Sequence, residues 1–130
     1  MYHKKLLITA ALSGITCVAL GAMGAHAFKD VLKETLHTYE KAVLYQLMHT
    51  LALFALAPVY QHFPDKKFKI AGYFWAAGIL LFSGSLYIYA LTTGMGILSF
   101  KWLVHITPFG GMSFILGWVF ILLGTLKMKN

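Results

Sequence analysis

The stretch IAGYFWAAGILLFSGSLYIYALTT at residues 70–93 decides the fold, because its 24 positions hold no charged side chain. A helix of about 20 apolar residues crosses the roughly 30 Å hydrocarbon core of a bilayer. Three further uncharged windows of similar length occupy residues 6–28, 42–63 and 103–126. The pattern predicts an all-α fold, an integral membrane four-helix bundle in which residues 1–130 form a single transmembrane domain.

Composition supports this fold class and excludes one class of function. Only 12% of the residues are charged, whereas an ordinary soluble domain has about 25%. The net charge of +7 comes from lysines at the ends of the windows, so no continuous basic face exists to hold phosphates. We therefore expect the lipid bilayer as a partner of the protein and no nucleic acid.

The lysines also predict the orientation, because the cytoplasmic loops of membrane proteins carry an excess of positive charge. Four spans divide the lysines into seven on the side of the termini and four on the other side. The seven are Lys4, Lys5, Lys66, Lys67, Lys69, Lys127 and Lys129, and the four are Lys29, Lys33, Lys41 and Lys101. Both termini are therefore predicted to be cytoplasmic.

The amino-terminal segment has a competing interpretation as a secretory signal peptide. Lys4 and Lys5 precede an apolar run that ends in Ala25-His26-Ala27, which resembles a cleavage site. The apolar core of a signal peptide spans about 7 to 15 residues. Because the window continues for 23 residues without a charge, we expect it to be retained as the first span.

The connection between the first two windows, residues 29–41, mixes charged and apolar residues at helical spacing. Val31, Leu32, Leu36 and Tyr39 recur at intervals that place them near one face of a helix. This pattern predicts a short interfacial helix between spans 1 and 2, with a solvated linker as the alternative.

Small residues recur at helical spacing in three of the four spans. Helices in lipid pack by close backbone approach and interhelical hydrogen bonds, which favours small residues at their contacts. The stripes are Ala10, Gly14, Cys17, Gly21 and Gly24 in the first span, Gly72, Ala76, Ser83, Ala90 and Gly94 in the third, and Thr107, Gly110, Phe114, Gly117 and Gly124 in the fourth. Because three stripes exceed what one short bundle can bury, we expect the protein to act through helix contacts, as a homo-oligomer or with a partner membrane protein.

Polar side chains of all four spans gather at similar depth. At about 1.5 Å per residue, they lie within roughly 15 Å of the span ends opposite the termini, in the outer half of the bundle. They are His26, Tyr45, Gln46, His49, Ser83, Ser85, Tyr87 and Thr107. A polar group that faces lipid leaves its hydrogen bonds unmade, so these side chains are expected to point into the bundle as a polar layer.

The polar layer has two interpretations, a structural network or a site that binds or transports a small ligand such as a lipid, quinone, ion or metal. Met23 with His26, and Met48 beside His49, offer ligands that suit copper, but no carboxylate completes a coordination shell. All four acidic residues lie outside the windows, so no nucleophile and base with an orienting carboxylate can be assembled. We expect no enzymatic activity, no cofactor and no metal centre.

Four motifs in order along the chain carry a family resemblance. They are Gly21-Ala22-Met23-Gly24-Ala25-His26, Tyr45-Gln46-Leu47-Met48-His49, Leu81-Phe82-Ser83-Gly84-Ser85-Leu86-Tyr87 and Ile106-Thr107-Pro108-Phe109-Gly110-Gly111. Together they resemble the small bacterial membrane proteins called domain of unknown function 423, although that family usually has Phe in place of Met23 and Gly in place of Ala27. The resemblance implies a multi-pass protein of the bacterial inner membrane with unassigned activity, and it adds Gly110 and Gly111 to the candidate site residues.

Overall fold

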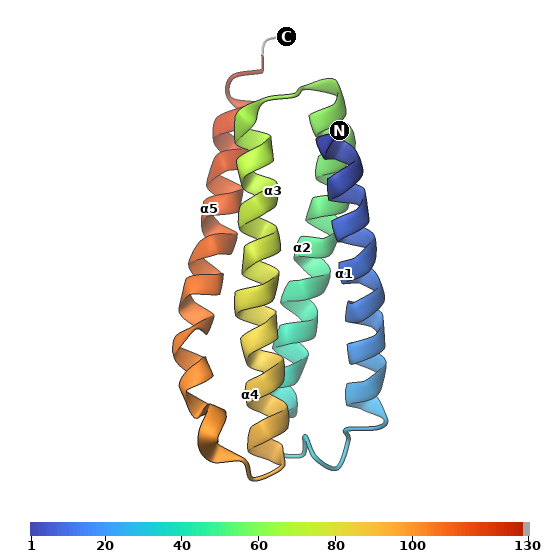
Figure 1. Cartoon of the computed structure of the whole chain (residues 1–130), viewed down its shortest axis with the longest axis vertical. Coiled ribbons are helices and arrows are strands. Elements are labelled where there is room, and N and C mark those ends of the chain that lie inside the picture. Colours follow the sequence, from blue (N-terminus) through green and yellow to red (C-terminus); the bar gives the residue numbers. More distant parts are fainter. Residues whose placement is uncertain (129–130) are drawn as a thin grey trace.

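The computed structural model describes residues 1–128, which form four long helical segments that run alternately up and down (Figure 1). The segments are α1 (Tyr2–Ala25), α2 (Leu36–His62), a composite of α3 (Lys66–Gly78), η1 (Ile79–Ser83) and α4 (Gly84–Gly94), and a composite of η2 (Leu98–His105) and α5 (Thr107–Thr125). η1 is a stretch of π-helix and η2 is a 3-10 helix. The start of α1 and the end of α5 lie at one end of the bundle, here called the terminal end, and the opposite end is called the loop end (Figure 1).

All four segments are long and apolar enough to cross a membrane, which agrees with the predicted fold class. The helix ends differ from the predicted windows. α1 ends at Ala25 rather than at 28, and α2 begins at Leu36 rather than at 42. The charges of Glu40 and Lys41 end an apolar window without ending a helix, because Glu and Lys are good helix formers.

The predicted short interfacial helix between spans 1 and 2 is not a separate element. Residues 26–35 form turns, and Leu36 already belongs to α2. The physical reason is that this connection packs against the bundle: Leu32 is fully buried, and the Thr35 hydroxyl donates a hydrogen bond to the Ala90 carbonyl oxygen at 2.9 Å. Of the apolar residues that predicted a helix on the membrane surface, Leu32 and Tyr39 are instead buried against α4, whereas Leu36 is exposed.

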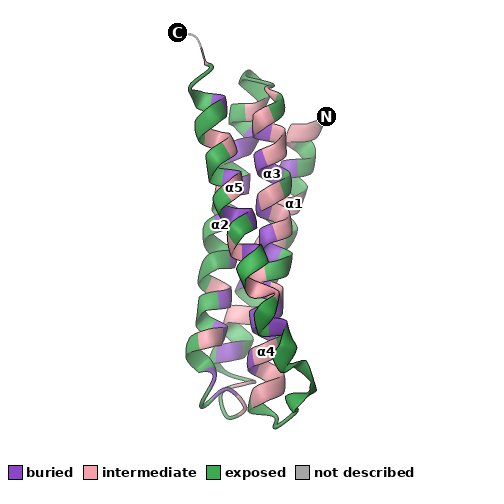
Figure 2. Ribbon diagram, turned by 90° about the vertical axis from the view of Figure 1, so that its left-hand side faces the viewer, coloured by how far each residue is buried: buried purple, intermediate pink, exposed green. Residues whose placement is uncertain are grey.

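The composite α3–η1–α4 segment and α2 form the centre of the bundle, and α1 and α5 flank them. α1 packs along α2, α5 packs along α3, and α2 contacts both α4 and η1. In the most apolar window of each segment, 39% of residues are buried in α2 and 44% in the third segment, but only 17% in α1 and 22% in the fourth. The two flanking helices are therefore the more exposed ones, and Figure 2 shows the exposed stretches of α5, which faces the viewer.

Many of the small residues lie at contacts between helices of the same chain. Four glycines lie so close to aromatic rings of neighbouring helices that an added Cβ would overlap the ring; the pairs are Gly24 with Tyr39, Gly78 with Phe114, Gly117 with Trp75, and Gly124 with Phe68. Cys17, in the stripe of the first span, is 3% exposed. The stripes of small residues therefore do not provide the surplus that the sequence argument for association assumed.

Two clusters of buried apolar side chains lie along the bundle. The cluster near the terminal end includes Leu53 and Phe68, and the cluster near the loop end includes Leu32 and Tyr39. Between them α2 carries three buried polar residues, Gln46, His49 and Thr50. The polar layer thus reaches the middle of the bundle, deeper than the predicted outer half, because His49 is the central residue of α2.

Candidate functional site

Gln46 joins three helices through its carboxamide group. Its side chain is buried, and Nε2 donates hydrogen bonds to the Ser13 carbonyl oxygen at 3.1 Å and to Thr16 Oγ1 at 2.9 Å. Oε1 accepts a hydrogen bond from the Tyr87 hydroxyl at 2.7 Å. A carboxamide has two donor hydrogens and one acceptor oxygen, so every polar atom of Gln46 is used in holding α1, α2 and α4 together.

Thr50 adds a second connection between α1 and α2. Its Oγ1 donates to the Gln46 carbonyl oxygen at 2.7 Å, and Ser13 Oγ lies 2.6 Å from the same Thr50 oxygen. A hydroxyl has one hydrogen to donate. Because the Thr50 hydrogen goes to the carbonyl, Ser13 is the donor in the contact between the two hydroxyls.

His49 connects α2 with α5 and uses both ring nitrogens. Its Nδ1 lies 2.9 Å from the Tyr45 carbonyl oxygen, and its Nε2 lies 3.2 Å from Trp118 Nε1. A carbonyl only accepts and an indole N–H only donates, which assigns the hydrogen to Nδ1 and the lone pair to Nε2. The imidazole also stacks on the Phe114 ring, with 3.6 Å between centroids and 10° between planes.

Hydroxyl groups of the third segment form the remaining contacts of the layer. Ser83, which is fully buried in η1, donates to the Ala42 carbonyl oxygen of α2 at 2.8 Å. Ser85 Oγ lies 2.8 Å from Thr107 Oγ1 and donates to the Phe82 carbonyl oxygen at 3.0 Å. Thr107 is therefore the donor to Ser85, which ties the start of α5 to α4.

The structure engages the polar side chains of six predicted site residues in hydrogen bonds between helices, namely Gln46, His49, Ser83, Ser85, Tyr87 and Thr107. The other four contribute differently. His26 is exposed at the end of α1, and Tyr45 is 37% exposed with its ring 4.6 Å from that of Phe82. Gly110 packs against the Phe82 backbone, whereas a Cβ on Gly111 would find only ordinary contacts.

Four members of the network were not predicted: Ser13, Thr16, Thr50 and Trp118. Ser13 and Thr16 are three residues apart and share a helix face, and this spacing is a signal that could have indicated them. Thr50 is four residues from Gln46, and this spacing also indicates that the two side chains share a helix face. No spacing signal indicated Trp118, because tryptophan also occurs in apolar helices without a polar role.

The chemistry available to this layer is that of hydrogen bonding between neutral groups. The acidic residues lie at the two ends of the bundle: Asp30 and Glu34 in turns, Glu40 in the second turn of α2, and Asp65 at the amino-terminal cap of α3. Met48 is 48% exposed while its neighbour His49 is buried, so the two side chains face different ways. The layer therefore fastens the helices to one another.

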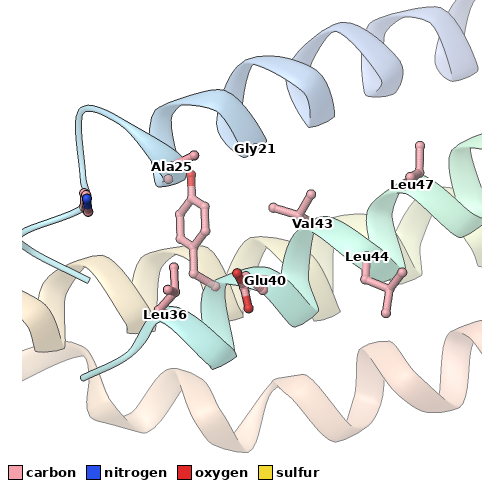
Figure 3. Close-up of a pocket in the computed structure, with 10 residues that line it drawn as sticks. Gly21, Ala25, Leu36, Glu40, Val43, Leu44 and Leu47 are labelled. Atoms are coloured by element: carbon pink, nitrogen blue, oxygen red, sulfur yellow. The ribbon is translucent and has the colours of Figure 1, made fainter. Parts of the chain in front are cut away.

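Grooves open between the helices on the surface of residues 1–128. A groove of about 470 Å³ runs between α1 and α2 near the loop end (Figure 3). A second, of about 300 Å³, lies between α1 and the third segment and is lined by Thr9, Ser13, Thr16 and Gln46 on its polar side. A third, of about 210 Å³, lies between α2 and α5 beside Trp75 and Trp118.

Comparison with known proteins places the chain among uncharacterised bacterial membrane proteins. Residues 20–111 match the family described as "Protein of unknown function (DUF423)". The chain is 40% identical over 129 residues to a "UPF0382 membrane protein" of Haemophilus influenzae, covering 98% of each chain. It is 39% identical over 135 residues to the "UPF0382 inner membrane protein YgdD" of Escherichia coli K12, covering all of this chain and 95% of the relative. No solved structure matches.

Proposed function

Since the chain belongs to the DUF423 (UPF0382) family of small bacterial inner-membrane proteins, we propose that it is a non-enzymatic membrane protein that acts through helix contacts and associates with a second copy of itself through α1. In this proposal the polar layer is structural and holds the four spans in register. Its role is to keep α1 in place while leaving most of that helix uncovered.

The observation that carries the proposal is the surface of α1. Only 17% of its most apolar window is buried, and its principal neighbour is α2. On the side that faces the third segment, Thr9, Ser13 and Thr16 line a groove open to lipid, and Thr16 is exposed. Hydroxyl groups next to lipid gain from a partner helix, because interhelical hydrogen bonds and close packing drive association in membranes.

A second copy of the chain is the partner that this surface fits. The Ser13 hydroxyl donates to Thr50, and the Thr16 hydroxyl donates to carbonyl oxygens of α1, so a second copy would gain from close packing against these small side chains and from the acceptor capacity that remains on their oxygens. A two-fold axis that runs beside α1 and parallel to it places the same residues of the two copies opposite one another. Two-fold dimers of this kind are the commonest homo-oligomers. The exposed apolar residues Leu12 and Ile15, at 61% and 68% exposure, would flank these contacts.

The orientation with both termini in the cytoplasm belongs to the same proposal. The described lysines at the terminal end are Lys4, Lys5, Lys66, Lys67, Lys69 and Lys127, against four at the loop end. The positive-inside rule places the richer side in the cytoplasm. The loop end, with its turn at Gly96, then faces the periplasm.

The alternative, binding or transport of a small ligand at the polar layer, has weaker support. Both ring nitrogens of His49 are engaged, and so is every polar atom of the Gln46 side chain. A ligand centred on His49 would have to replace the Trp118 hydrogen bond and the stacking on Phe114. The grooves described above lie at the surface of the bundle rather than around this imidazole.

Disulfide crosslinking in native membranes tests association through α1. Cys17 is buried and its Sγ donates to the Val43 carbonyl oxygen at 3.5 Å, so the native thiol is not a suitable reporter. We would place the thiol at Leu12→Cys in a Cys17→Ala background and oxidise the membranes. A disulfide-linked dimer on a non-reducing gel is expected.

The matched control is Ile115→Cys in the same background, because Ile115 is 59% exposed near the middle of α5. It should give little dimer. Thr9→Val should reduce the Leu12→Cys crosslink without lowering the thermal stability of the fold. If Leu12→Cys crosslinks no more than Ile115→Cys, and the protein is a monomer in several mild detergents, self-association through α1 is wrong.

A further inference from the structure

The terminal end of the bundle carries positive charge with little to balance it. Among the described residues, this end holds six lysines and one acidic side chain, that of Asp65. The Asp65 carboxylate is already engaged, because it accepts the Lys67 backbone N–H at 2.7 Å as the cap of α3. Within residues 1–128, the one ion pair found lies at the loop end, between Lys33 and Asp30. The lysines of the terminal end therefore have no ion-pair partner in the described part of the chain.

Two of these lysines come from different helical segments and lie side by side. Lys67 is in the first turn of α3, and Lys127 is in the turn after α5, the helix that packs along α3 (Figure 1). Their amino groups are within hydrogen-bonding reach of each other, and this contact lowers the pKa of Lys67. The first turn of a helix is also the positive end of its dipole. An anion placed between the two amino groups would relieve the repulsion that each exerts on the charge of the other.

A pocket of about 360 Å³ lies beside this lysine pair. Phe63, Pro64, Asp65, Lys127 and Met128 are among the residues that line it. Phe63 is the last residue of the uncharged window 42–63, and Lys127 directly follows the window 103–126. The pocket is therefore at the edge of the hydrocarbon core, where lipid headgroups surround a membrane protein. Phe63 is 46% exposed, so the site offers an apolar surface next to the amino groups.

The charge around the pocket decides the class of lipid. Lys66, Lys67 and Lys127 face a single carboxylate, that of Asp65, which already accepts a hydrogen bond. Basic pockets between transmembrane helices bind anionic headgroups. The headgroup of phosphatidylglycerol has a phosphate and uncharged hydroxyls. In phosphatidylethanolamine a primary ammonium follows the phosphate, and here it would lie among like charges.

We propose that the pair of Lys67 and Lys127 binds the phosphate of one anionic phospholipid, phosphatidylglycerol, at the terminal end of the bundle. The site is separate from the polar layer. It requires neither the association through α1 nor a particular orientation in the membrane. Because Lys127 is exposed, salt screens the interaction, and the lipid is expected to bind more weakly as the salt concentration rises.

Lipid binding by the purified, delipidated protein tests this site. Dioleoyl-phosphatidylglycerol or dioleoyl-phosphatidylethanolamine is titrated in a mild detergent, and native mass spectrometry counts the bound lipid. The wild type should bind the glycerol lipid about fivefold more tightly, which is the factor that one lysine contributes near an anionic surface. Inorganic phosphate, at matched ionic strength, should not displace the lipid. Lipid is counted on the monomer peak, so failure of the dimer proposal leaves this result readable.

Substitutions assign the site to the lysine pair. Lys67→Gln and Lys127→Gln should each reduce the preference for the glycerol lipid by about two- to fivefold, without changing the binding of the ethanolamine lipid. Two variants are matched controls and should keep the preference. Lys5→Gln removes the same charge from α1 at the same end of the bundle. Lys69→Gln removes it from the same turn of α3, but the Lys69 amino group lies 5.6 Å from the centroid of the Tyr2 ring.

Three outcomes would overturn the proposal. The first is a wild type that binds the two lipids equally. The second is a loss for Lys5→Gln as large as that for Lys67→Gln, because the preference would then come from the overall charge of this end. The third is displacement of the lipid by inorganic phosphate, which would show that the site takes the free anion. Size-exclusion chromatography and circular dichroism verify that each variant is folded.

Discussion

At the scale of single residues, the position of His49 shows why a polar group is present at the middle of a membrane bundle. Its imidazole takes a hydrogen bond from Trp118 of α5 and gives one to the Tyr45 carbonyl of its own helix. Among the described residues, the stacking of His49 on Phe114 has the shortest distance between ring centroids, and it joins α2 to α5. His49 therefore holds α2 and α5 at a defined distance through one hydrogen bond and one ring contact.

Replacing His49 with Leu should lower the stability of the bundle. The change removes the acceptor of the Trp118 N–H and the stacking on Phe114, and the loss of one or two interhelical hydrogen bonds is worth about 0.6 to 2 kcal/mol in a membrane protein. Thermal unfolding in detergent measures the effect. His62→Leu is the matched control, because His62 makes the same bond to the carbonyl four residues earlier, at 2.8 Å, but is exposed. Equal melting temperatures for the two variants would contradict this assignment.

At the scale of helical elements, η1 decides how the third segment meets its neighbours. In this stretch of π-helix the Gly84 N–H bonds to the Ile79 carbonyl, five residues back. Short π-helical stretches inside α-helices change the direction of the side chains around them. Here Ser83 reaches the Ala42 carbonyl of α2, and the Phe82 backbone approaches Gly110 of α5.

Adjacent glycines of α5 provide a matched test of that approach. A Cβ at Gly110 would lie 2.7 Å from Phe82 Cα, whereas a Cβ at Gly111 would lie 3.8 Å from the Phe82 ring. Gly110→Ala should cost about 1 to 3 kcal/mol, because overpacking forces helices apart. Gly111→Ala should leave the melting temperature unchanged or slightly higher, since Ala favours helix more than Gly. A similar loss for both variants would show that the close contact between η1 and α5 does not limit the packing.

The same elements show which features could be predicted from the sequence. The uncharged windows predicted four spans, because a charged side chain within the lipid is unfavourable whatever the fold. The free-energy cost of unpaired polar groups predicted that Gln46 and His49 face inward. The π-helix of η1 left no such signal, because it depends on how Ser83 and Phe82 meet other helices. Ser13 was not included in the predicted polar layer for a related reason: depth along one span does not give the vertical offset between neighbouring spans, and in the structure Ser13 lies near the middle of α1 beside Thr50.

At the scale of the whole molecule, the bundle is asymmetric in how its helices are covered. α2 and the α3–η1–α4 segment carry most of the buried surface, while α1 and α5 lie on opposite flanks (Figure 1). The proposed association surface lies on the side of α1 that faces the third segment.

The orientation of the whole bundle in the membrane gives the last prediction. With the terminal end richer in lysine, both termini are expected in the cytoplasm. Alkaline phosphatase fused to the carboxyl terminus should then be inactive, because it needs the oxidising periplasm to form its disulfides, and a green fluorescent protein fusion there should be bright. The same reporters inserted at the Gly96 turn should give the opposite pattern. Active phosphatase at the carboxyl terminus would contradict this topology and would place the Gly96 turn in the cytoplasm.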